Sequence, residues 1–148
     1  MKSLNITTVI QRTLSWIPGW EKKNALVLSS SRGLGLGIAE ALADEGANVL
    51  LTGRSEERLK ENVTRINKKG KGRAEYARID LNDVESVSVI KKSVKEFFGG
   101  ADILINNTGG PPPGKMVDAD INTLPEQIEA MVTRIVQITD MIIPHMRA

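Results

Sequence analysis

The feature that most constrains this chain is a regular alternation between strand-like and helix-like segments. Strand-like segments occur at 25–28, 48–52, 74–79 and 102–106, and a helical pattern follows each of them after a few residues. The first two are apolar runs without polar alternation, which is typical of strands covered on both faces. Alternating units of this kind predict an α/β domain: a doubly wound parallel sheet with right-handed crossovers and helices on both faces.

Capping signals set the expected helix boundaries. The first helix is expected from about residue 34 to residue 45, and Gly46 ends it. Ser55 is the expected N-cap of the second helix, and Asn82 or Asp83 is the expected N-cap of the third. Each helix therefore starts shortly after the carboxyl end of a strand.

The last helix is expected to begin at a capping box of Thr123 and Glu126 around Pro125, and to end at Pro144. Apolar residues recur along it at helical spacing, which predicts that one of its faces packs inward. The residues expected on this face are Ile128, Val132, Ile135 and Ile142.

Residues 1–23 differ from the rest of the chain because their apolar residues form only a loose helical pattern, closed by Pro18 and Gly19. We interpret them as an N-terminal helical leader that packs on its own domain or subunit, rather than as an amphipathic arm for a membrane surface. Residues 24–148 form the second unit, and no linker divides it.

Composition argues against several classes of function. The formal net charge is +2 without a basic stripe, and aromatic residues are few, so no nucleic-acid surface is expected. The absence of cysteine and the presence of one histidine argue against a metal site. No apolar run approaches the ~20 residues that a membrane span needs. We expect a cytoplasmic protein that binds neither nucleic acid nor membrane.

The turn after the first strand is rich in serine and glycine, and it runs from Ser29 to Gly37. Gly33 and Gly35 remove side chains where a pyrophosphate must approach the backbone. The helix that begins there aims free N–H groups at the phosphates. Ligands of open α/β sheets bind at this edge, so the turn predicts a dinucleotide site.

The turn at residues 52–55 indicates which dinucleotide is bound. An acidic residue about twenty positions past the glycine motif would bind the 2′-hydroxyl of NAD, and none is present. Arg54, with Arg32 from the first turn, offers guanidinium donors to a phosphate. We therefore expect NADP as the cofactor in preference to NAD.

Four motifs at suitable intervals make the chain resemble the short-chain dehydrogenases/reductases, with members such as 3-oxoacyl-acyl-carrier-protein reductases. They are the glycine motif at 25–35, Asp80-Leu81 after the third strand, residues 106–109 (Asn-Asn-Thr-Gly) after the fourth, and 144–146 (Pro-His-Met) at the end of the last helix. The resemblance covers residues 24–146.

The resemblance implies a Rossmann-like fold with strand order 3-2-1-4, truncated before the later strands. It implies hydride transfer between NADP(H) and a small carbonyl compound or secondary alcohol. In such proteins Asp80 and Leu81 would contact adenine, and Asn107 would brace the central strands near the nicotinamide. The candidate cofactor-binding residues are Ser29, Ser31, Arg32, Gly33, Leu34, Gly35, Arg54, Ser55, Asp80, Leu81, Asn107, Thr108 and Gly109.

The chain departs from the family pattern in three places. Ser29 stands where the family has its first glycine, and Met131 aligns near the asparagine of its catalytic tetrad. The family's Tyr-x-x-x-Lys pair, whose lysine lowers the pKa of the tyrosine for acid–base work, is absent. The single tyrosine, Tyr76, is followed four residues later by Asp80. We therefore expect no catalytic residue in these 148 residues and no activity from them alone.

Two alternatives to the oxidoreductase were considered. Residues 109–116 fit the spacing of a P-loop up to its last position, but three prolines remove amide donors and Met116 lacks the hydroxyl that binds magnesium. A nucleoside triphosphatase is therefore disfavoured. A non-catalytic nucleotide-binding or interaction remnant of the same fold stays open, and an in-frame Tyr-x-x-x-Lys past Ala148 would decide for the enzyme.

The expected topology leaves the fourth strand as an edge of the sheet. In enzymes that the chain resembles, the last helix packs in a subunit interface. An apolar edge strand beside an apolar helix favours association, so we expect a homo-oligomer.

Overall fold

The structure, a computed structural model, describes residues 19–110, 114–115, 117 and 120–147. Most of the proposed leader and the three prolines of the P-loop-like segment therefore lie outside the described residues. Four parallel strands form one sheet in the order β3-β2-β1-β4, which confirms the expected topology. The strands are β1 (Asn24–Val27), β2 (Asn48–Gly53), β3 (Ala74–Arg78) and β4 (Ile103–Ile105).

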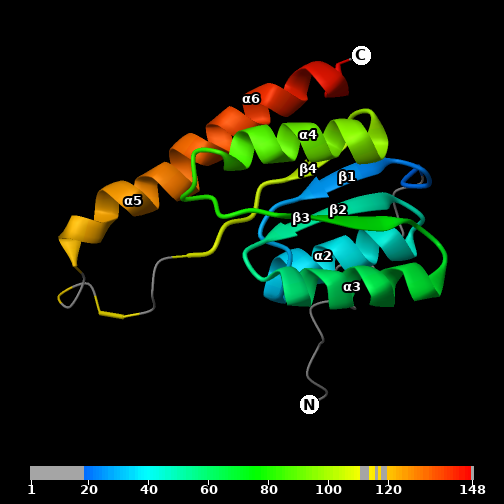
Figure 1. The fold of residues 1–148 in the computed structure, drawn as a ribbon, viewed down its shortest axis with the longest axis horizontal. Helices are drawn as coiled ribbons and strands as arrows, with labels where there is room; N and C mark the ends of the chain where they lie inside the picture. The colour runs from blue at the N-terminus through cyan, green and yellow to red at the C-terminus, as the bar shows by residue number, and fades with distance from the viewer. Residues whose placement is uncertain (1–18, 111–113, 116, 118–119, 148) are drawn as a thin grey trace.

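Helices cover both faces of the sheet (Figure 1). The helices α2 (Gly33–Asp44) and α3 (Glu56–Lys69) lie on one face, and α4 (Ser86–Phe98) and α6 (Arg134–Met146) lie on the other. A short 3₁₀ turn, η2 (Ile121–Thr123), is followed by α5 (Leu124–Ile128) and by a π-helical turn, η3 (Glu129–Thr133), which runs into α6. The segment of α5 and η3 extends beyond the sheet (Figure 1).

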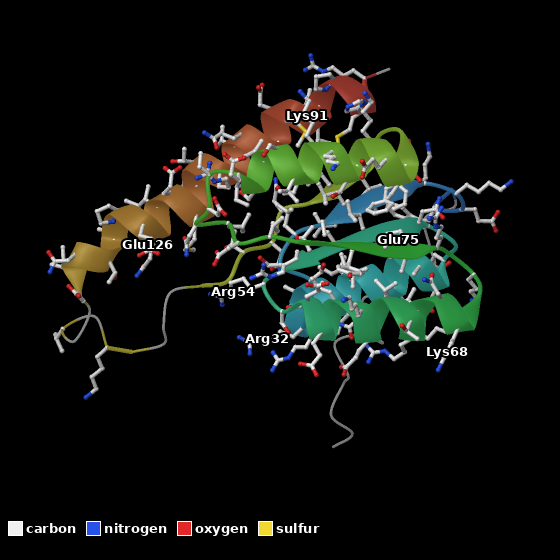
Figure 2. All side chains as sticks on the ribbon, viewed as in Figure 1. Arg32, Arg54, Lys68, Glu75, Lys91 and Glu126 are labelled. Atoms are coloured by element: carbon white, nitrogen blue, oxygen red, sulfur yellow. The ribbon has the colours of Figure 1, made fainter. Side chains whose placement is uncertain are left out.

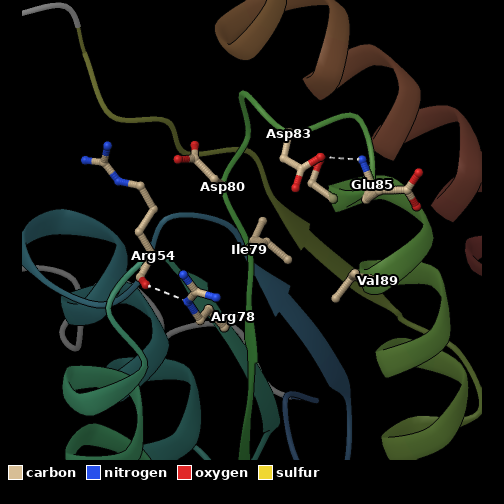
Figure 3. A pocket seen from close by; sticks show the side chains of 8 residues that line it. Arg54, Arg78, Ile79, Asp80, Asp83, Glu85 and Val89 are labelled. Carbon is tan, nitrogen blue, oxygen red and sulfur yellow. Dashed lines mark hydrogen bonds between the residues drawn. The ribbon is translucent and has the colours of Figure 1, made fainter.

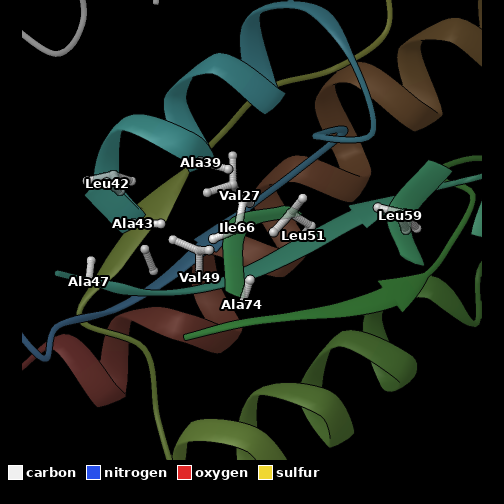
Figure 4. Packing of buried hydrophobic residues seen from close by; sticks show 11 residues of the cluster. Val27, Ala39, Leu42, Ala43, Ala47, Val49, Leu51, Leu59, Ile66 and Ala74 are labelled. Carbon is white, nitrogen blue, oxygen red and sulfur yellow. The ribbon is translucent and has the colours of Figure 1, made fainter. Parts of the chain in front are cut away.

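The core consists of two apolar layers, because side chains of a strand alternate between the faces of the sheet. Val27, Val49 and Leu51 pack with α2 and α3 in the first layer (Figure 4). Leu26 and Leu50 face the second layer, where they meet α4 and α6. Burial of each side chain of this size contributes about 1.5–3 kcal/mol to the stability of the fold. Packing on both faces therefore fixes the strands, and with them the turns at their ends.

The expected cap of the third helix is wrong, whereas the last helix begins after Thr123 as expected but without the side-chain bonds of a capping box. Helix α4 begins at Ser86, because Asp83 accepts a hydrogen bond from the amide of Glu85 at 3.0 Å in a turn of its own. This local bond competes with capping. Thr123 makes no capping hydrogen bond, and its hydroxyl instead donates to the carbonyl of Asp120 at 2.8 Å.

The last helix also differs from expectation at its end and on its inward face. Pro144 lies inside α6, which continues to Met146 although proline offers no N–H to the carbonyl four residues earlier. Ile142 is buried as expected, but Ile128 and Val132 are 49% and 55% exposed. The π turn inserts an extra residue and rotates the pattern, so that Ile138 is buried instead.

None of the helices within the described residues combines the length and the apolar character that a membrane span requires.

Candidate functional site

A cleft of about 810 Å³ lies at the carboxyl ends of the four strands, within the usual size range of ligand pockets. It joins turns that are distant in sequence, as expected for the ligand edge of a parallel sheet. From the candidate set it is lined by Ser29, Ser31, Arg32, Gly33, Leu34, Arg54, Asp80, Leu81, Asn107, Thr108 and Gly109.

Two candidate residues, Gly35 and Ser55, lie beside the cleft and do not line it. Gly35 allows a close approach between α2 and the first turn: a Cβ there would lie 2.6 Å from the carbonyl oxygen of Ser29 and 2.7 Å from Nδ2 of Asn107. Ser55 caps α3, and its hydroxyl accepts a hydrogen bond from the amide of Arg58 at 3.5 Å. Both residues shape the turns rather than the cavity.

Asn107 braces the first turn from the neighbouring strand. Its Nδ2 donates to the carbonyl oxygens of Leu28, at 3.2 Å, and Ser29, at 3.1 Å. Ser29 has a φ of +48°, in the left-handed region that an L-residue occupies at a cost. The chain therefore keeps the backbone bend that a glycine would make there, with a serine held in place by the next strand.

The first and second turns are joined by buried hydroxyl groups. The hydroxyl of Ser30 donates to the carbonyl of Val27 at 2.8 Å and accepts from the amide of Thr52 at 2.9 Å. The amide of Ser30 donates to the carbonyl of Thr52 at 2.7 Å. These bonds fix the second turn, which carries Arg54, against the first, which carries Arg32.

The N-terminus of α2 faces the cleft through Gly33 and Leu34. Arg32 is its N-cap residue and forms no side-chain capping bond, and no acidic residue lies in the first turn. The first amides of this helix are thus left without the side-chain acceptor that usually satisfies them, and the positive end of the helix dipole adds to their field. Such an end can bind an anion.

Arg32 and Arg54 lie at the same end of the sheet, away from Lys68 and Glu75 at the other end (Figure 2). Arg54 also borders a smaller cavity of about 150 Å³ that Arg78, Asp80 and Ser86 help to line (Figure 3). There Nε of Arg78 donates to the backbone carbonyl of Arg54 at 3.2 Å. This bond joins the second turn to the end of β3. It uses the backbone of Arg54, so the Arg54 guanidinium takes no part in it.

The far wall of the cleft was missed by sequence reasoning, apart from Met131, which the family resemblance had aligned near the asparagine of the catalytic tetrad. It is formed by the segment that follows β4, with Thr123, Glu126 and Gln127 before the π turn and Ala130 and Met131 within it. The available signal was positional, because a segment leaving the end of β4 must start at the same edge as the other turns. The π turn itself has no signature in the sequence.

Tyr76 lies in β3 as expected, and it packs against the first core layer. Its hydroxyl donates to Oε1 of Glu56 at 3.2 Å, which is away from the cleft lining. Lys60, whose Nζ lies 2.7 Å from the same oxygen, lowers the pKa of the Glu56 carboxyl by hydrogen bonding and by its charge. Among the described cleft-lining residues there is neither a tyrosine nor a lysine.

Comparison with known sequences gives matches along nearly the whole described chain. The family model for short chain dehydrogenase matches residues 23–148. An oxidoreductase of Botryotinia fuckeliana is 36% identical over 121 residues, which are 82% of this chain and 43% of that protein. The 3-oxoacyl-[acyl-carrier-protein] reductase of Vibrio cholerae is 40% identical over 89 residues, which are 60% of this chain and 35% of that protein.

Solved structures show the same arrangement of elements. L-sorbose reductase from Gluconobacter frateurii, complexed with NADPH and L-sorbose, has a TM-score of 0.80 and 34% identity, covering 87% of this chain and 49% of that chain. A 3-oxoacyl-(acyl-carrier-protein) reductase from Agrobacterium tumefaciens with NADP bound has a TM-score of 0.75 and 27% identity, covering 99% of this chain and 53% of that chain. The chain thus spans about half the length of these relatives.

Proposed function

The chain belongs to the short-chain dehydrogenase family, and on this premise we propose that it supplies the NADP(H)-binding half of an oxidoreductase. The reaction would transfer hydride between NADP(H) and a small carbonyl compound or secondary alcohol. The observation that carries the proposal is the cleft at the carboxyl ends of the four strands, in which turns from distant parts of the sequence meet.

The geometry of the first turn fits a pyrophosphate. Helix α2 presents its N-terminal amides without a side-chain cap, and Gly33 leaves open space where a Cβ would otherwise stand. A diphosphate at this position would accept hydrogen bonds from these amides and would interact favourably with the helix dipole. The adenine would then lie toward Asp80 and Leu81, and the nicotinamide toward Asn107 and Thr108.

The second turn supports NADP over NAD. Arg54 lines the cleft, and the turn from Thr52 to Ser55 carries no carboxylate that would bind a free ribose 2′-hydroxyl. We assign Arg54 and Arg32 to the 2′-phosphate, because guanidinium groups bind phosphate oxygens through paired donors. The bond from Arg78 to the Arg54 carbonyl would hold the turn in this orientation.

Chemistry at the substrate would need groups that these 148 residues do not contain. The cofactor, when bound, supplies or accepts the hydride. The family's tyrosine and lysine would move the proton, and Tyr76 does not stand in for them because its hydroxyl is bonded to Glu56. We propose that this chain binds and orients the dinucleotide and that a part of the protein beyond it performs the proton transfer. A small carbonyl or alcohol substrate would bind only with that part.

The exposed side of the last helix supports a homo-oligomer. Leu124, Ile128, Val132 and Val136 are all exposed and recur every fourth residue along α5, η3 and α6. An apolar stripe of this kind would be covered by a second copy or by the rest of the protein.

A thermal-shift titration with NADP⁺ and NAD⁺ tests the cofactor proposal. A ligand that binds only the folded chain raises the melting midpoint in proportion to the logarithm of the ligand concentration. We expect the larger rise with NADP⁺. Arg54→Asp should reverse this preference, because a carboxylate would repel the 2′-phosphate and accept from a 2′-hydroxyl. Arg58→Asp is the matched control, since it makes the same charge change four residues on, outside the residues that line the cleft.

Two results would contradict the proposal. Stabilisation by neither dinucleotide would remove the binding function. A clear preference of the unmodified chain for NAD⁺ would remove the role given to Arg54.

A further inference from the structure

Arg134 is the one charged residue that is buried among those the structure describes; it is 3% exposed. It is the first residue of α6, directly after the π turn. A guanidinium group taken out of water costs several kcal/mol unless hydrogen-bond acceptors replace the water. The partners of Arg134 therefore indicate what its burial achieves.

Each nitrogen of the Arg134 guanidinium has a partner. Two partners come from its own helical segment: Nη2 donates to Oε1 of Glu129 at 3.0 Å, and Nη1 donates to Oε1 of Gln137 at 2.7 Å. Glu129 precedes Arg134 by five residues and opens the π turn, whose backbone repeat spans five residues. These two bonds hold the guanidinium plane in one orientation.

The third partner lies far away in the sequence. Nε of Arg134 donates to the backbone carbonyl of Leu81 at 3.2 Å, in the connection between β3 and α4. Asp80 and Leu81 of this connection line the cleft, and so do Ala130 and Met131 of the π turn. Ala130 also packs against the core cluster that contains Leu81. Arg134 therefore joins two neighbouring segments of the cleft lining that are distant in sequence.

We propose that Arg134 is a positioning residue that fixes the β3–α4 connection, with Asp80 and Leu81, against the π turn where both segments line the cleft. The proposal rests on the proposed function, because it takes the adenosine half of NADP(H) as the ligand of Asp80 and Leu81. Without the bond to Leu81, part of the binding energy would go into ordering the β3–α4 connection. Arg134 itself would not touch the cofactor.

Binding of adenosine 2′,5′-bisphosphate to the full chain, measured by calorimetry, tests the proposal with the part of the cofactor that Asp80 and Leu81 would contact. Arg134→Met keeps the length of the side chain and removes all its donors, and we expect affinity to fall about tenfold, because binding must then order the β3–α4 connection. Arg134→Lys keeps the charge and one donor group, and it should recover part of the loss.

The control separates positioning from general stability. Ile138→Val removes one methylene group from the same helix one turn later, where the side chain packs in the second core layer and Arg134 keeps its partners. All variants are measured at the same interval below their own melting midpoints, and Ile138→Val should bind as the unmodified chain does. Glu129→Gln, at a half-exposed partner, supplies a second variant if Arg134→Met does not fold, and it should weaken binding severalfold.

The outcomes are distinguishable. If the unmodified chain does not bind adenosine 2′,5′-bisphosphate, the proposed function fails and this inference fails with it. If the unmodified chain binds and both Arg134→Met and Glu129→Gln bind equally well, only the positioning role is overturned. An equal loss of affinity in Ile138→Val would also overturn it, because α6 would then act only through stability.

Discussion

Ser29 carries a conformational cost at the entrance to the cleft. Its φ of +48° places it in the left-handed region, at the position where the family resemblance expects a glycine. The bend persists because Asn107 binds the Ser29 carbonyl and the hydroxyl of Thr52 accepts from the Ser29 amide at 3.1 Å. The family resemblance marks this serine as a departure from the pattern, and the structure locates its cost in the backbone.

Ser29→Gly should therefore stabilise the fold. An L-residue in the left-handed region costs the folded state about 1–2 kcal/mol. Glycine removes this cost, but its greater freedom in the unfolded chain lowers the gain in stability by about 0.5–1 kcal/mol. We expect the free energy of unfolding to rise by up to about 1 kcal/mol, measured by urea denaturation.

Ser31→Gly is the matched control in the same turn, because Ser31 is not among the described residues with positive φ. It should lower the free energy of unfolding. A stability loss in Ser29→Gly of the size seen in Ser31→Gly would show that the turn stores no strain.

At the scale of single elements, the start of α3 shows how local charges act. Glu56 lies in the first turn, where a negative charge suits the helix dipole. Lys60, one turn later, lowers the pKa of the Glu56 carboxyl, and the Tyr76 hydroxyl adds to the effect from β3. The same pairing raises the pKa of Lys60.

Lys60→Met should raise the pKa of Glu56 toward its ordinary value, because the largest cause of the lowering is removed. Because the folded-state pKa lies below the unfolded value, the contribution of Glu56 to stability is present above the unfolded pKa and is lost as pH falls through the folded pKa. Titration of the Glu56 carboxyl carbon by NMR checks the direction. Lys68→Met, at the other end of α3, is the control and should leave this titration unchanged; an unchanged titration in Lys60→Met would contradict the assignment.

Some elements could be predicted from the sequence and others could not. The first two strands were predicted because each is a short apolar run ended by a turn. The cap at Ser55 is confirmed, because its hydroxyl accepts from the amide of Arg58 at the start of α3. The predicted inward face of the last helix was wrong for another reason. Ile128 and Val132 fit an ideal helical repeat with Ile135, but the π turn from Glu129 to Thr133 adds a residue to this repeat before α6 begins. Only packing decides such an insertion, so the far wall of the cleft could not be derived from spacing.

At the scale of the whole molecule, the alternation of strands and helices predicted the parallel sheet, and the family resemblance predicted its strand order. Right-handed crossovers place α2 and α3 on one face and α4 and α6 on the other, and the carboxyl ends of all strands meet at one edge. The positions of Arg32 and Arg54 follow from this rule. The network of Arg134 does not, because the bond to Leu81 joins residues 53 positions apart through a buried side chain.

The molecule exposes an apolar stripe along its last helical segment. Ile128 and Val132 lie on the exposed stripe, in the segment that extends beyond the sheet. If this stripe is the contact between two copies, the chain should sediment as an oligomer at micromolar concentration. The double substitution of Ile128 and Val132 to Glu should then give the monomer, because burying two carboxylates in an apolar contact costs more than the contact provides.

Val84→Glu provides the comparison, because Val84 is 68% exposed in the β3–α4 connection and lies off the stripe. It adds a negative charge to an exposed apolar site and should leave sedimentation unchanged. Loss of the oligomer in both variants would mean that charge alone disperses the chain. A stable monomer of the unmodified chain at micromolar concentration would contradict the homo-oligomer and would show that the exposed stripe does not join two copies.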